Sequence, residues 1–319
     1  MKSYYLISLG CPKNLVDSQG IATLLQRAGY EPVPVPEEAD LVIVNTCGFI
    51  ASAREESRAV LQELIESKPP GQEVVAAGCY SQRFPSQLAD DLPGIDGLIG
   101  TRRWMDILEL VEKLEARRGL GQPSGPAYHV PDVPTVGQDT QDVVRAVSQG
   151  ASAYLRVSDG CRRACAFCAI PLIKGPAVSR PPADILTDAG LLAEVGTKEI
   201  ILIGQDTTDY GYDLGSDIDL AWLMERLVEK IPQVPWVRLM YAYPGHIGDR
   251  LIETMAGHEQ ILPYVDLPLQ HAHPDVLRRM RRPADVERVK GTINSLRWAM
   301  PNIAIRTTFL VGYPGETEE

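Results

Sequence analysis

Three cysteines lie close together in the stretch DGCRRACAFCAIP. Cys161, Cys165 and Cys168 follow the spacing C-x3-C-x2-C. A structural zinc site usually takes four protein ligands, often from paired C-x2-C turns. Three thiolates on one short loop instead match three corners of a cubane iron–sulfur cluster, and the fourth iron is then free to bind a small molecule. We therefore interpret the loop as a 4Fe-4S site. A zinc loop with a distant fourth ligand and three unrelated buried cysteines are the alternatives.

The other three cysteines each follow a short apolar stretch. Cys11 follows YYLISLG, Cys47 follows LVIVNT and Cys79 follows EVVAAG. A single cysteine in such a position is usually a small buried residue. The carboxyl ends of neighbouring parallel strands, however, share one edge of a sheet, where ligands bind. We interpret these three thiols as the ligands of a second 4Fe-4S cluster, with simple burial as the alternative.

The N-terminal part of the chain alternates apolar runs with amphipathic stretches. The expected strands cover 4–10, 40–46, 73–78 and 94–100, and the expected helices cover 14–30, 51–68 and 103–118. Alternating strands and helices of this size indicate a parallel sheet with helices on both faces. The sequence therefore predicts an α/β domain with a doubly wound parallel sheet over residues 1–118, in which the ends of the first three strands each carry one of the first three cysteines.

Residues 119–150 are rich in Gly, Pro, Gln and Asp without periodicity, which is typical of a linker. A second strand–helix series follows. Its expected strands cover 153–160, 199–204, 236–243, 264–270 and 303–313, and its expected helices 183–195, 219–231, 247–258, 274–281 and 285–299. Five such units predict a partial (βα) barrel over 151–319, whose strands end at one catalytic rim. The chain stops in PGETEE, which resembles the start of another helix, so we expect an incomplete barrel.

Composition excludes several classes of protein. Apolar residues make up 45% of the 319 residues and charged residues 23%, as in soluble globular proteins. The net charge of −11 argues against nucleic-acid binding through bulk charge. No apolar run approaches the roughly 18 residues of a membrane-spanning helix, and the first residues lack the features of a signal peptide. We expect a cytoplasmic protein without membrane or DNA partners. Six reduced cysteines there suit metal binding or catalysis better than disulfides.

Taken together, these motifs resemble the methylthiotransferase family of radical S-adenosylmethionine enzymes. The N-terminal part matches in SLGCPKNLVDSQ, VNTCGFI and AAGCYSQR, and the second part in GCRRACAFCAIP, LIGQDTTDYG, VDLPLQHAHPDVLRRMRRP and TTFLVGYPGET. The resemblance covers nearly the whole chain. It also implies a small β-rich C-terminal domain that is missing from this sequence.

The resemblance implies a radical reaction. The free iron of the cluster on Cys161, Cys165 and Cys168 would bind S-adenosylmethionine, and one electron would release a 5′-deoxyadenosyl radical that abstracts hydrogen. The cofactors would be two 4Fe-4S clusters and S-adenosylmethionine, which serves both as methyl donor and as radical source. The cluster on Cys11, Cys47 and Cys79 would hold or deliver the sulfur. An electron donor such as flavodoxin or ferredoxin would be a partner.

The family has two relevant branches, one acting on an adenosine of transfer RNA and one on the β-carbon of an aspartate in small-subunit ribosomal protein number twelve. This chain reads GQDTTDYG where the transfer-RNA branch typically has GQNVNSYG, and LPLQHAHP where that branch has Gln-Ser-Gly. Both differences favour the ribosomal-protein branch. Methylthiolation of transfer-RNA adenosine and a non-enzymatic iron–sulfur or zinc protein are the alternatives.

Several polar residues are secondary candidates. Gln205 and Asp206 follow a barrel strand at the catalytic rim, and Arg306 lies inside another strand, so all three are candidate contacts to S-adenosylmethionine. Turn chemistry explains the first two equally well, and an internal ion pair is the alternative for Arg306. Arg162 and Arg163 are candidates to tune the adjacent cluster.

Two further basic features are noted. RRMRR, residues 278–282, is interpreted as a cationic helix C-terminus that complements the helix dipole, rather than as a nucleic-acid patch. Lys174 stands where the family usually has Arg, a departure that keeps the positive charge.

Overall fold

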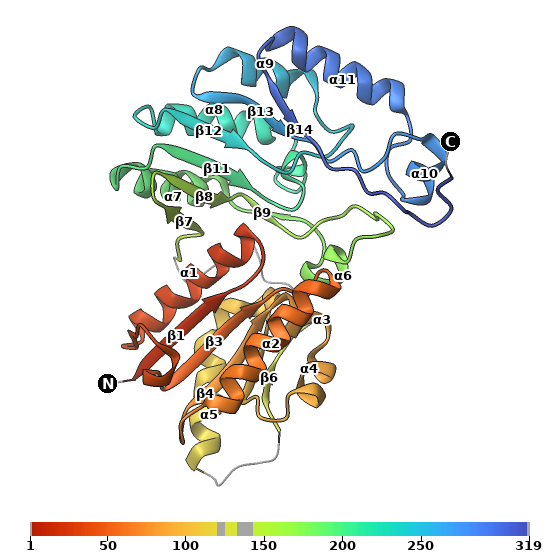
Figure 1. Cartoon of the computed structure of the whole chain (residues 1–319). Coiled ribbons are helices and arrows are strands. Elements are labelled where there is room, and N and C mark those ends of the chain that lie inside the picture. Colours follow the sequence, from red (N-terminus) through yellow and green to blue (C-terminus); the bar gives the residue numbers. More distant parts are fainter. Residues whose placement is uncertain (1, 120–124, 133–142, 318–319) are drawn as a thin grey trace. The chain divides into compact units, whose positions relative to one another are not determined.

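The computed structural model describes residues 2–119, 125–132 and 143–317. Their contacts divide the chain into two compact units. The N-terminal unit is Met1–Arg145 together with the short segment Leu172–Gly175, and the C-terminal unit is Ala146–Pro171 together with Pro176–Glu319. Figure 1 colours the two units from red to yellow and from green to blue, apart from that short segment.

A six-stranded parallel sheet forms the centre of the N-terminal unit, in the order β2-β1-β3-β4-β5-β6. The strands are β1 Ser3–Ser8, β2 Glu31–Pro32, β3 Leu41–Thr46, β4 Glu73–Gly78, β5 Gly97–Gly100 and β6 Ala127–His129. The strand order reverses between β1 and β3, and ligands bind at the carboxyl ends of the strands beside such a reversal in doubly wound sheets.

Helices cover both faces of this sheet. They are α1 Pro12–Arg27, α2 Ala51–Ser67, α3 Cys79–Arg83, α4 Pro85–Asp91 and α5 Ile107–Gly119, with the 3-10 turns η1 Pro36–Glu38 and η2 Thr101–Asp106. Helices α1 and α5 pack on the face that contains Ile43, whereas α2, α3 and α4 pack on the face that contains Val42 and Val44. Strand β3 is buried along its whole length because both of its faces are covered, which explains its unbroken apolar sequence.

A second six-stranded sheet forms the C-terminal unit, in the order β14-β13-β12-β11-β8-β7. Its strands are β7 Ala146–Gln149, β8 Ser152–Arg156, β11 Glu199–Ile203, β12 Trp236–Leu239, β13 Ile261–Asp266 and β14 Ala304–Arg306. All neighbours from β8 to β14 are parallel, and β7 is antiparallel to β8 at the edge. A separate antiparallel pair joins β9 Ser158–Asp159 to β10 Val178–Ser179.

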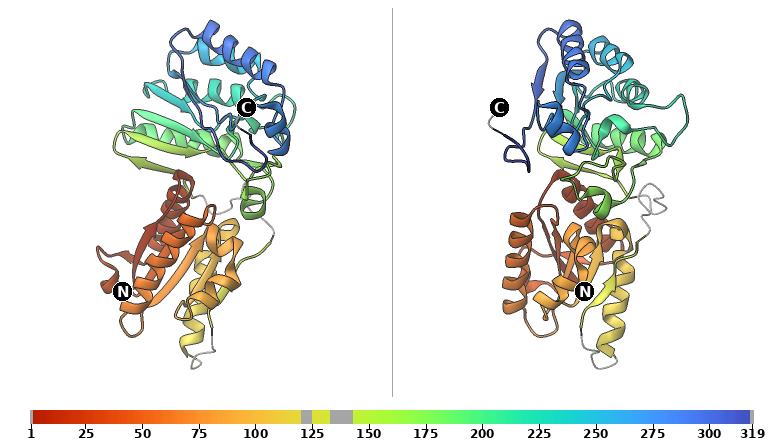
Figure 2. Two further views of the ribbon diagram at one scale, coloured as in Figure 1. Left: turned by 45° about the vertical axis from the view of Figure 1, so that its right-hand side comes forward. Right: turned by 90° about the vertical axis from the view of Figure 1, so that its right-hand side faces the viewer.

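The helices of this unit follow one another along one side of its curved sheet (Figure 2). The helical elements are α7 Pro182–Glu194, η3 Thr207–Asp209, α8 Leu220–Lys230, α9 Asp249–Gly257, α10 Pro274–Arg279 and α11 Val286–Ala299. The short helix α6 Ile170–Lys174 begins in this unit, and its residues from Leu172 on belong to the N-terminal unit. Helix α8 contacts both α7 and α9, and α9 contacts α11. This arrangement is a partial (βα) barrel, whose strand ends and following loops carry the candidate site.

The predicted fold class is confirmed, since the two sheets are the parallel N-terminal sheet and the partial barrel expected from the sequence. The elements differ in detail. The expected strand 153–160 is interrupted after Arg156, where the chain leaves the main sheet and pairs with β10. The expected strand 303–313 forms a ladder only over β14, with one isolated bridge between Gln270 and Phe309 beyond it. The expected helix 103–118 begins as a 3-10 turn.

Sequence periodicity missed the short elements, among them β6 and β7, because a few residues carry no recognisable period. Residues 120–124 and 133–142 of the expected linker lie outside the described residues. The domain boundaries predicted from the sequence stay a prediction. No helix in the described part of the chain is long and apolar enough to cross a membrane.

Candidate iron–sulfur centres

The first three cysteines lie at the carboxyl ends of three adjacent strands. Cys11 caps the start of α1 after β1, Cys47 follows β3, and Cys79 begins α3 directly after β4. The loops approach closely. A Cβ added to Gly10, which has a φ of +94°, would lie 2.9 Å from Cβ of Cys47, and one added to Gly48 would lie 2.6 Å from the carbonyl oxygen of Cys79. The fold thus brings these three thiols to one sheet edge, and we call them the N-terminal triad.

Asn14 ties the loops of the N-terminal triad together. Its side-chain amide donates hydrogen bonds to the carbonyl oxygens of Leu9, at 2.9 Å, and Thr46, at 3.0 Å. Its Oδ1 accepts from the thiol of Cys79 at 3.8 Å. Asn14 is 1% exposed, and no sequence pattern singled it out; the only available signal was its place in the CPKN stretch.

Burial dominates the acidity of these thiols. It raises the pKa of Cys79 to about 12, with the nearby thiols of Cys11 and Cys47 adding to the rise and the ammonium of Lys174 opposing it. Burial also raises the pKa of Cys47. Since metals bind the thiolate, iron would have to displace these protons, and its positive charge would replace the missing solvation.

Lys174 lies in the N-terminal unit with the segment Leu172–Gly175. Its ammonium forms an ion pair of 3.0 Å with Oδ2 of Asp17 on α1, and both side chains are only 2% exposed. Arg102 holds the segment through hydrogen bonds to the carbonyl oxygens of Ile173 and Leu172, at 2.9 and 2.7 Å. A buried cation therefore accompanies Cys79.

The second three cysteines lie on the loop between β9 and α6, and we call them the C-terminal triad. Backbone N–H groups point at two of the sulfurs: Arg163 donates to Sγ of Cys161 at 3.4 Å, and Ile170 donates to Sγ of Cys168 at 3.5 Å. Burial raises the pKa of Cys161 to about 11, and the N–H of Arg163 opposes this rise. The loop thus supplies hydrogen-bond donors to its own sulfurs, as thiolate ligands of a cluster require.

Cys165 is contacted by side chains instead. Nη1 of Arg282 lies 3.8 Å from its sulfur, and the side chain of Tyr243 lies near it. Burial raises the pKa of Tyr243 to about 12, so this hydroxyl is protonated at neutral pH and can donate. No sequence pattern singled out Tyr243, and Arg282 was noted only as part of a basic helix end.

The two arginines beside Cys161 point their guanidinium groups at carboxylates. Arg162 binds both oxygens of Asp209, at 2.6 and 2.7 Å, while Arg163 binds Asp206 at 2.8 Å and Asp209 at 2.7 Å. Burial of Asp209 opposes its ionisation, yet the two guanidiniums hold its pKa below the usual range. These ion pairs offset the charges of Arg162 and Arg163. The prediction that they tune the cluster stays a prediction.

The predicted contacts to S-adenosylmethionine have different surroundings. Oε1 of Gln205 is buried and has no hydrogen-bond partner among the described residues, which leaves it available to a ligand. Asp206 is 6% exposed and accepts from Arg163. Arg306 forms an ion pair of 3.0 Å with Asp266 across β13 and β14, the internal pairing that the sequence left open. Binding of S-adenosylmethionine by Gln205, Asp206 and Arg306 stays a prediction.

The spacing of the sulfurs distinguishes a cluster from a single ion. Thiolates around one zinc lie roughly 3.8 Å apart, because the Zn–S bond is about 2.3 Å long and the site is tetrahedral. In the described part of the chain, one set of three His, Cys, Asp or Glu side chains has its ligand atoms within 4.8 Å of one another, and it contains no cysteine. Each triad offers three thiols as candidate ligands. This donor set fits a cubane cluster with one open iron.

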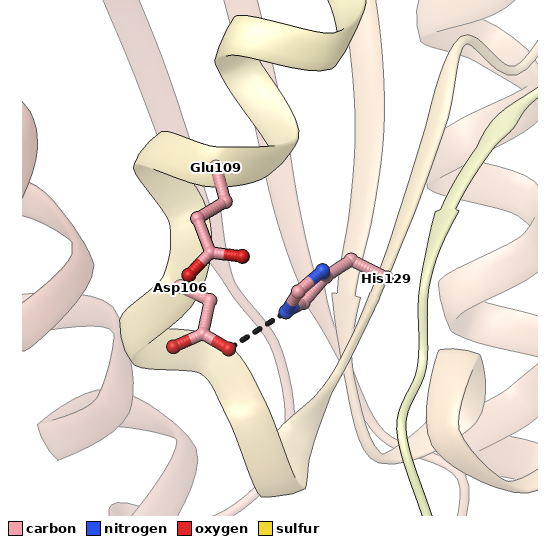
Figure 3. A group of neighbouring side chains, drawn as sticks. All are labelled: Asp106, Glu109 and His129. Carbon is pink, nitrogen blue, oxygen red and sulfur yellow. Dashed lines mark hydrogen bonds and ion pairs between the residues drawn. The ribbon is translucent and has the colours of Figure 1, made fainter.

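The set that does meet this distance is Asp106, Glu109 and His129 (Figure 3). Nε2 of His129 hydrogen-bonds Oδ2 of Asp106 at 2.7 Å, and its Nδ1 lies 3.1 Å from the ammonium of Lys113. Asp106 also pairs with Arg103. Both ring nitrogens of His129 are thus engaged and Arg103 already balances Asp106, so this group is a structural ion-pair network.

Family models match both parts of the chain. The model described as the uncharacterized protein family UPF0004 matches residues 3–100, and the model of the radical SAM superfamily matches residues 155–319. Among solved structures, the radical S-adenosylmethionine methyltransferase TsrM from Kitasatospora setae, with cobalamin and a 4Fe-4S cluster bound, has a TM-score of 0.69 at 18% identity. The match covers 99% of this chain and 71% of that one, and it shows the shared fold.

Curated relatives are much closer in sequence. The ribosomal protein uS12 methylthiotransferase RimO of Chloroflexus aurantiacus is 49% identical over 321 residues, which cover 98% of this chain and 70% of the relative. The protein of the same name from a Roseiflexus species is 47% identical over 327 residues, which cover 98% of this chain and 69% of the relative. The chain therefore belongs to the radical S-adenosylmethionine superfamily and, within it, to the family of the RimO methylthiotransferases.

Proposed function

We propose that this protein adds a methylthio group to the β-carbon of an aspartate in ribosomal protein uS12 by radical S-adenosylmethionine chemistry. The observation that carries the proposal is the close identity to uS12 methylthiotransferases over 98% of the chain. Two cysteine triads agree with it, one at the carboxyl ends of three strands of the parallel N-terminal sheet and one on the loop between β9 and α6. The enzyme is a methylthiotransferase whose cofactors are 4Fe-4S clusters and S-adenosylmethionine.

Cys161, Cys165 and Cys168 would hold the cluster that binds S-adenosylmethionine. When bound, this cluster supplies the electron that generates the radical for hydrogen abstraction. The residues of the loop prepare the site. The N–H groups of Arg163 and Ile170 stabilise negative charge on two sulfurs, and the free Oε1 of Gln205 offers an acceptor to a ligand at the barrel rim.

Cys11, Cys47 and Cys79 would hold the second cluster, which takes part in sulfur delivery. Asn14 fixes the spacing of their loops, and the buried Lys174 offsets part of the negative charge of three thiolates. We further propose a cytoplasmic location and a small electron-transfer protein such as flavodoxin or ferredoxin as the reductant, with no DNA or membrane partner.

The deciding experiment offers the anaerobically reconstituted protein two substrates, uS12 and transfer RNA, together with S-adenosylmethionine and a reductant. Mass spectrometry should find one methylthio group on a uS12 peptide and none on adenosine. The Cys161→Ala protein is the negative control. A product on transfer RNA alone would refute the proposal, and one zinc per chain without acid-labile sulfide would refute radical chemistry altogether.

A further inference from the structure

The turn that follows α10 contacts the loop of the C-terminal triad. The backbone N–H of Ala166, inside the C-x2-C stretch, donates to the carbonyl oxygen of Met280 at 2.9 Å. From the same turn, Nη1 of Arg282 reaches Sγ of Cys165 at 3.8 Å. These residues belong to RRMRR, which the sequence indicated only as a basic helix end. The fold thus gives the last arginine of that motif a place beside a predicted cluster ligand.

The position of Arg282 is fixed from several sides. Met280 is fully buried, Arg281 adopts a left-handed φ of 54°, and the N–H of Arg282 donates back to the carbonyl oxygen of Leu277 at 2.8 Å. Its Nη2 donates to the carbonyl oxygen of Pro268, and its guanidinium carbon lies 4.3 Å from the centre of the Tyr243 ring. A planar guanidinium held in this way aims its N–H groups in fixed directions.

The guanidinium of Arg282 has different surroundings from the guanidiniums of Arg162 and Arg163 next to Cys161. Arg162 and Arg163 pair with Asp206 and Asp209, whereas within the described residues no carboxylate pairs with Arg282. Its Nε is buried and has no hydrogen-bond partner within these residues. Arg282 therefore presents an unneutralised cation and a spare donor where three thiolates would gather.

We propose that Arg282 is a positioning residue for the cluster of the C-terminal triad: it orients the thiolate of Cys165 and favours the reduced, more negative state of the cluster. This inference rests on the proposed function, because it takes the triad to be a 4Fe-4S site. Hydrogen bonds and positive charge at the sulfur ligands stabilise the added electron and raise the reduction potential. The hydrogen bond from Ala166 to the carbonyl of Met280 holds the loop in place, so that Nη1 of Arg282 and the sulfur of Cys165 keep their relative positions.

The test isolates this cluster. In the full chain, Cys11, Cys47 and Cys79 are all replaced by Ala, and the remaining cluster is titrated with a reductant while its electron paramagnetic resonance signal is measured. Arg282→Gln should lower the ratio of reduced to oxidised cluster at a given potential at least tenfold, which corresponds to 59 mV for a one-electron couple. Arg282→Lys keeps the positive charge but loses the planar guanidinium. Its ratio of reduced to oxidised cluster should lie between those of the parent protein and of Arg282→Gln. Arg278→Gln changes an exposed arginine of the same motif that pairs with Asp275, and it should leave the titration unchanged.

The outcomes separate the two proposals. An Arg282→Gln protein that binds the same amount of iron and titrates like its parent would overturn the role of Arg282. A folded Arg282→Gln protein that loses iron would support it, because the thiolate is no longer held. If this variant does not fold, the Lys variant decides, and an unchanged titration there overturns the role. A parent protein that binds no 4Fe-4S cluster at all would instead overturn the proposed function.

Discussion

The two cysteine triads reach similar donor sets by different routes. The C-terminal triad lies within eight residues of sequence, from Cys161 to Cys168, and its own backbone N–H groups face two of its sulfurs. The N-terminal triad comes from three separate strand ends, which only the sheet order β1-β3-β4 brings together. The first site is therefore mostly local, whereas the second depends on the whole N-terminal fold.

The cations near the two triads also differ in how deeply they are buried and in what holds them. Lys174, beside the N-terminal triad, is buried and paired with Asp17, so removing it breaks a buried ion pair. Arg282, beside the C-terminal triad, is partly exposed and is held by carbonyl and aromatic contacts. We expect the first cation to support the fold as well as the site, and the second to affect mainly the cluster.

The largest expected effect separates the chemical roles of the triads. Cys161→Ala should abolish release of 5′-deoxyadenosine, because it removes a ligand of the cluster that binds S-adenosylmethionine. Cys47→Ala should retain that release and lose formation of the methylthio product. Both products are measured by liquid chromatography and mass spectrometry in the same reactions. Loss of 5′-deoxyadenosine in both variants would remove the proposed division of labour.

The next effect concerns the buried pair. Lys174→Met removes the buried ammonium that pairs with Asp17, and breaking a buried ion pair costs about 3–5 kcal/mol of unfolding free energy. The double variant Lys174→Met with Asp17→Leu should recover most of that loss. Urea unfolding of the protein without iron measures both, with the exposed Lys198→Met as the control. Equal stability of single and double variants would contradict this account.

A smaller effect tests the close approach of loops at the N-terminal triad. Gly10→Ala places a Cβ 2.9 Å from that of Cys47, on a backbone with a φ of +94°. Such strain costs about 1–3 kcal/mol. Iron bound at the N-terminal triad should decrease, while 5′-deoxyadenosine release stays close to the parent level. Gly29→Ala, where the φ is +85° but no atom lies within 4 Å, is the matched control for backbone strain alone.

The smallest effect concerns acid sensitivity near the C-terminal triad. Burial raises the pKa of Asp209, but Arg162 and Arg163 outweigh it and hold this pKa below its ordinary value of 3.8. Its pairing therefore stabilises the folded state fully above that pH, and the contribution is lost as pH falls through the lower folded pKa. Asp209→Asn should remove this contribution and lower the melting temperature near neutral pH. The melting temperatures of both proteins, measured from pH 6 to 3, should converge at the acid end.

Much of this molecule is readable in its sequence. The spacing of Cys161, Cys165 and Cys168 is local, so no fold is needed to recognise it. The unbroken apolar run of β3 predicted a strand buried on both faces, and the alternation of strands and helices predicted two parallel sheets. The sequence also predicted that Cys11, Cys47 and Cys79 lie close together, because the carboxyl ends of parallel strands share an edge.

The sequence did not predict the partners of individual side chains. The sequence could not tell that Arg306 pairs with Asp266, that Asp206 accepts from Arg163, or that Lys174 lies buried beside Asp17. Each of these contacts joins residues from separate elements, and its geometry depends on strand register and on the path of the loops. Periodicity reports which face of an element is buried, but it carries no information about what that face meets.

The sequence by itself therefore determined the types and spacing of the sulfur ligands and the class of fold that presents them. Only the tertiary structure decided which cations accompany them. In the sequence, RRMRR is an ordinary basic helix end. In the structure, Arg281 has a left-handed backbone and the next residue, Arg282, places an N–H donor at Cys165. Charge is a property of composition, whereas its effect on a site falls steeply with distance, and distance is set by the packing of remote segments.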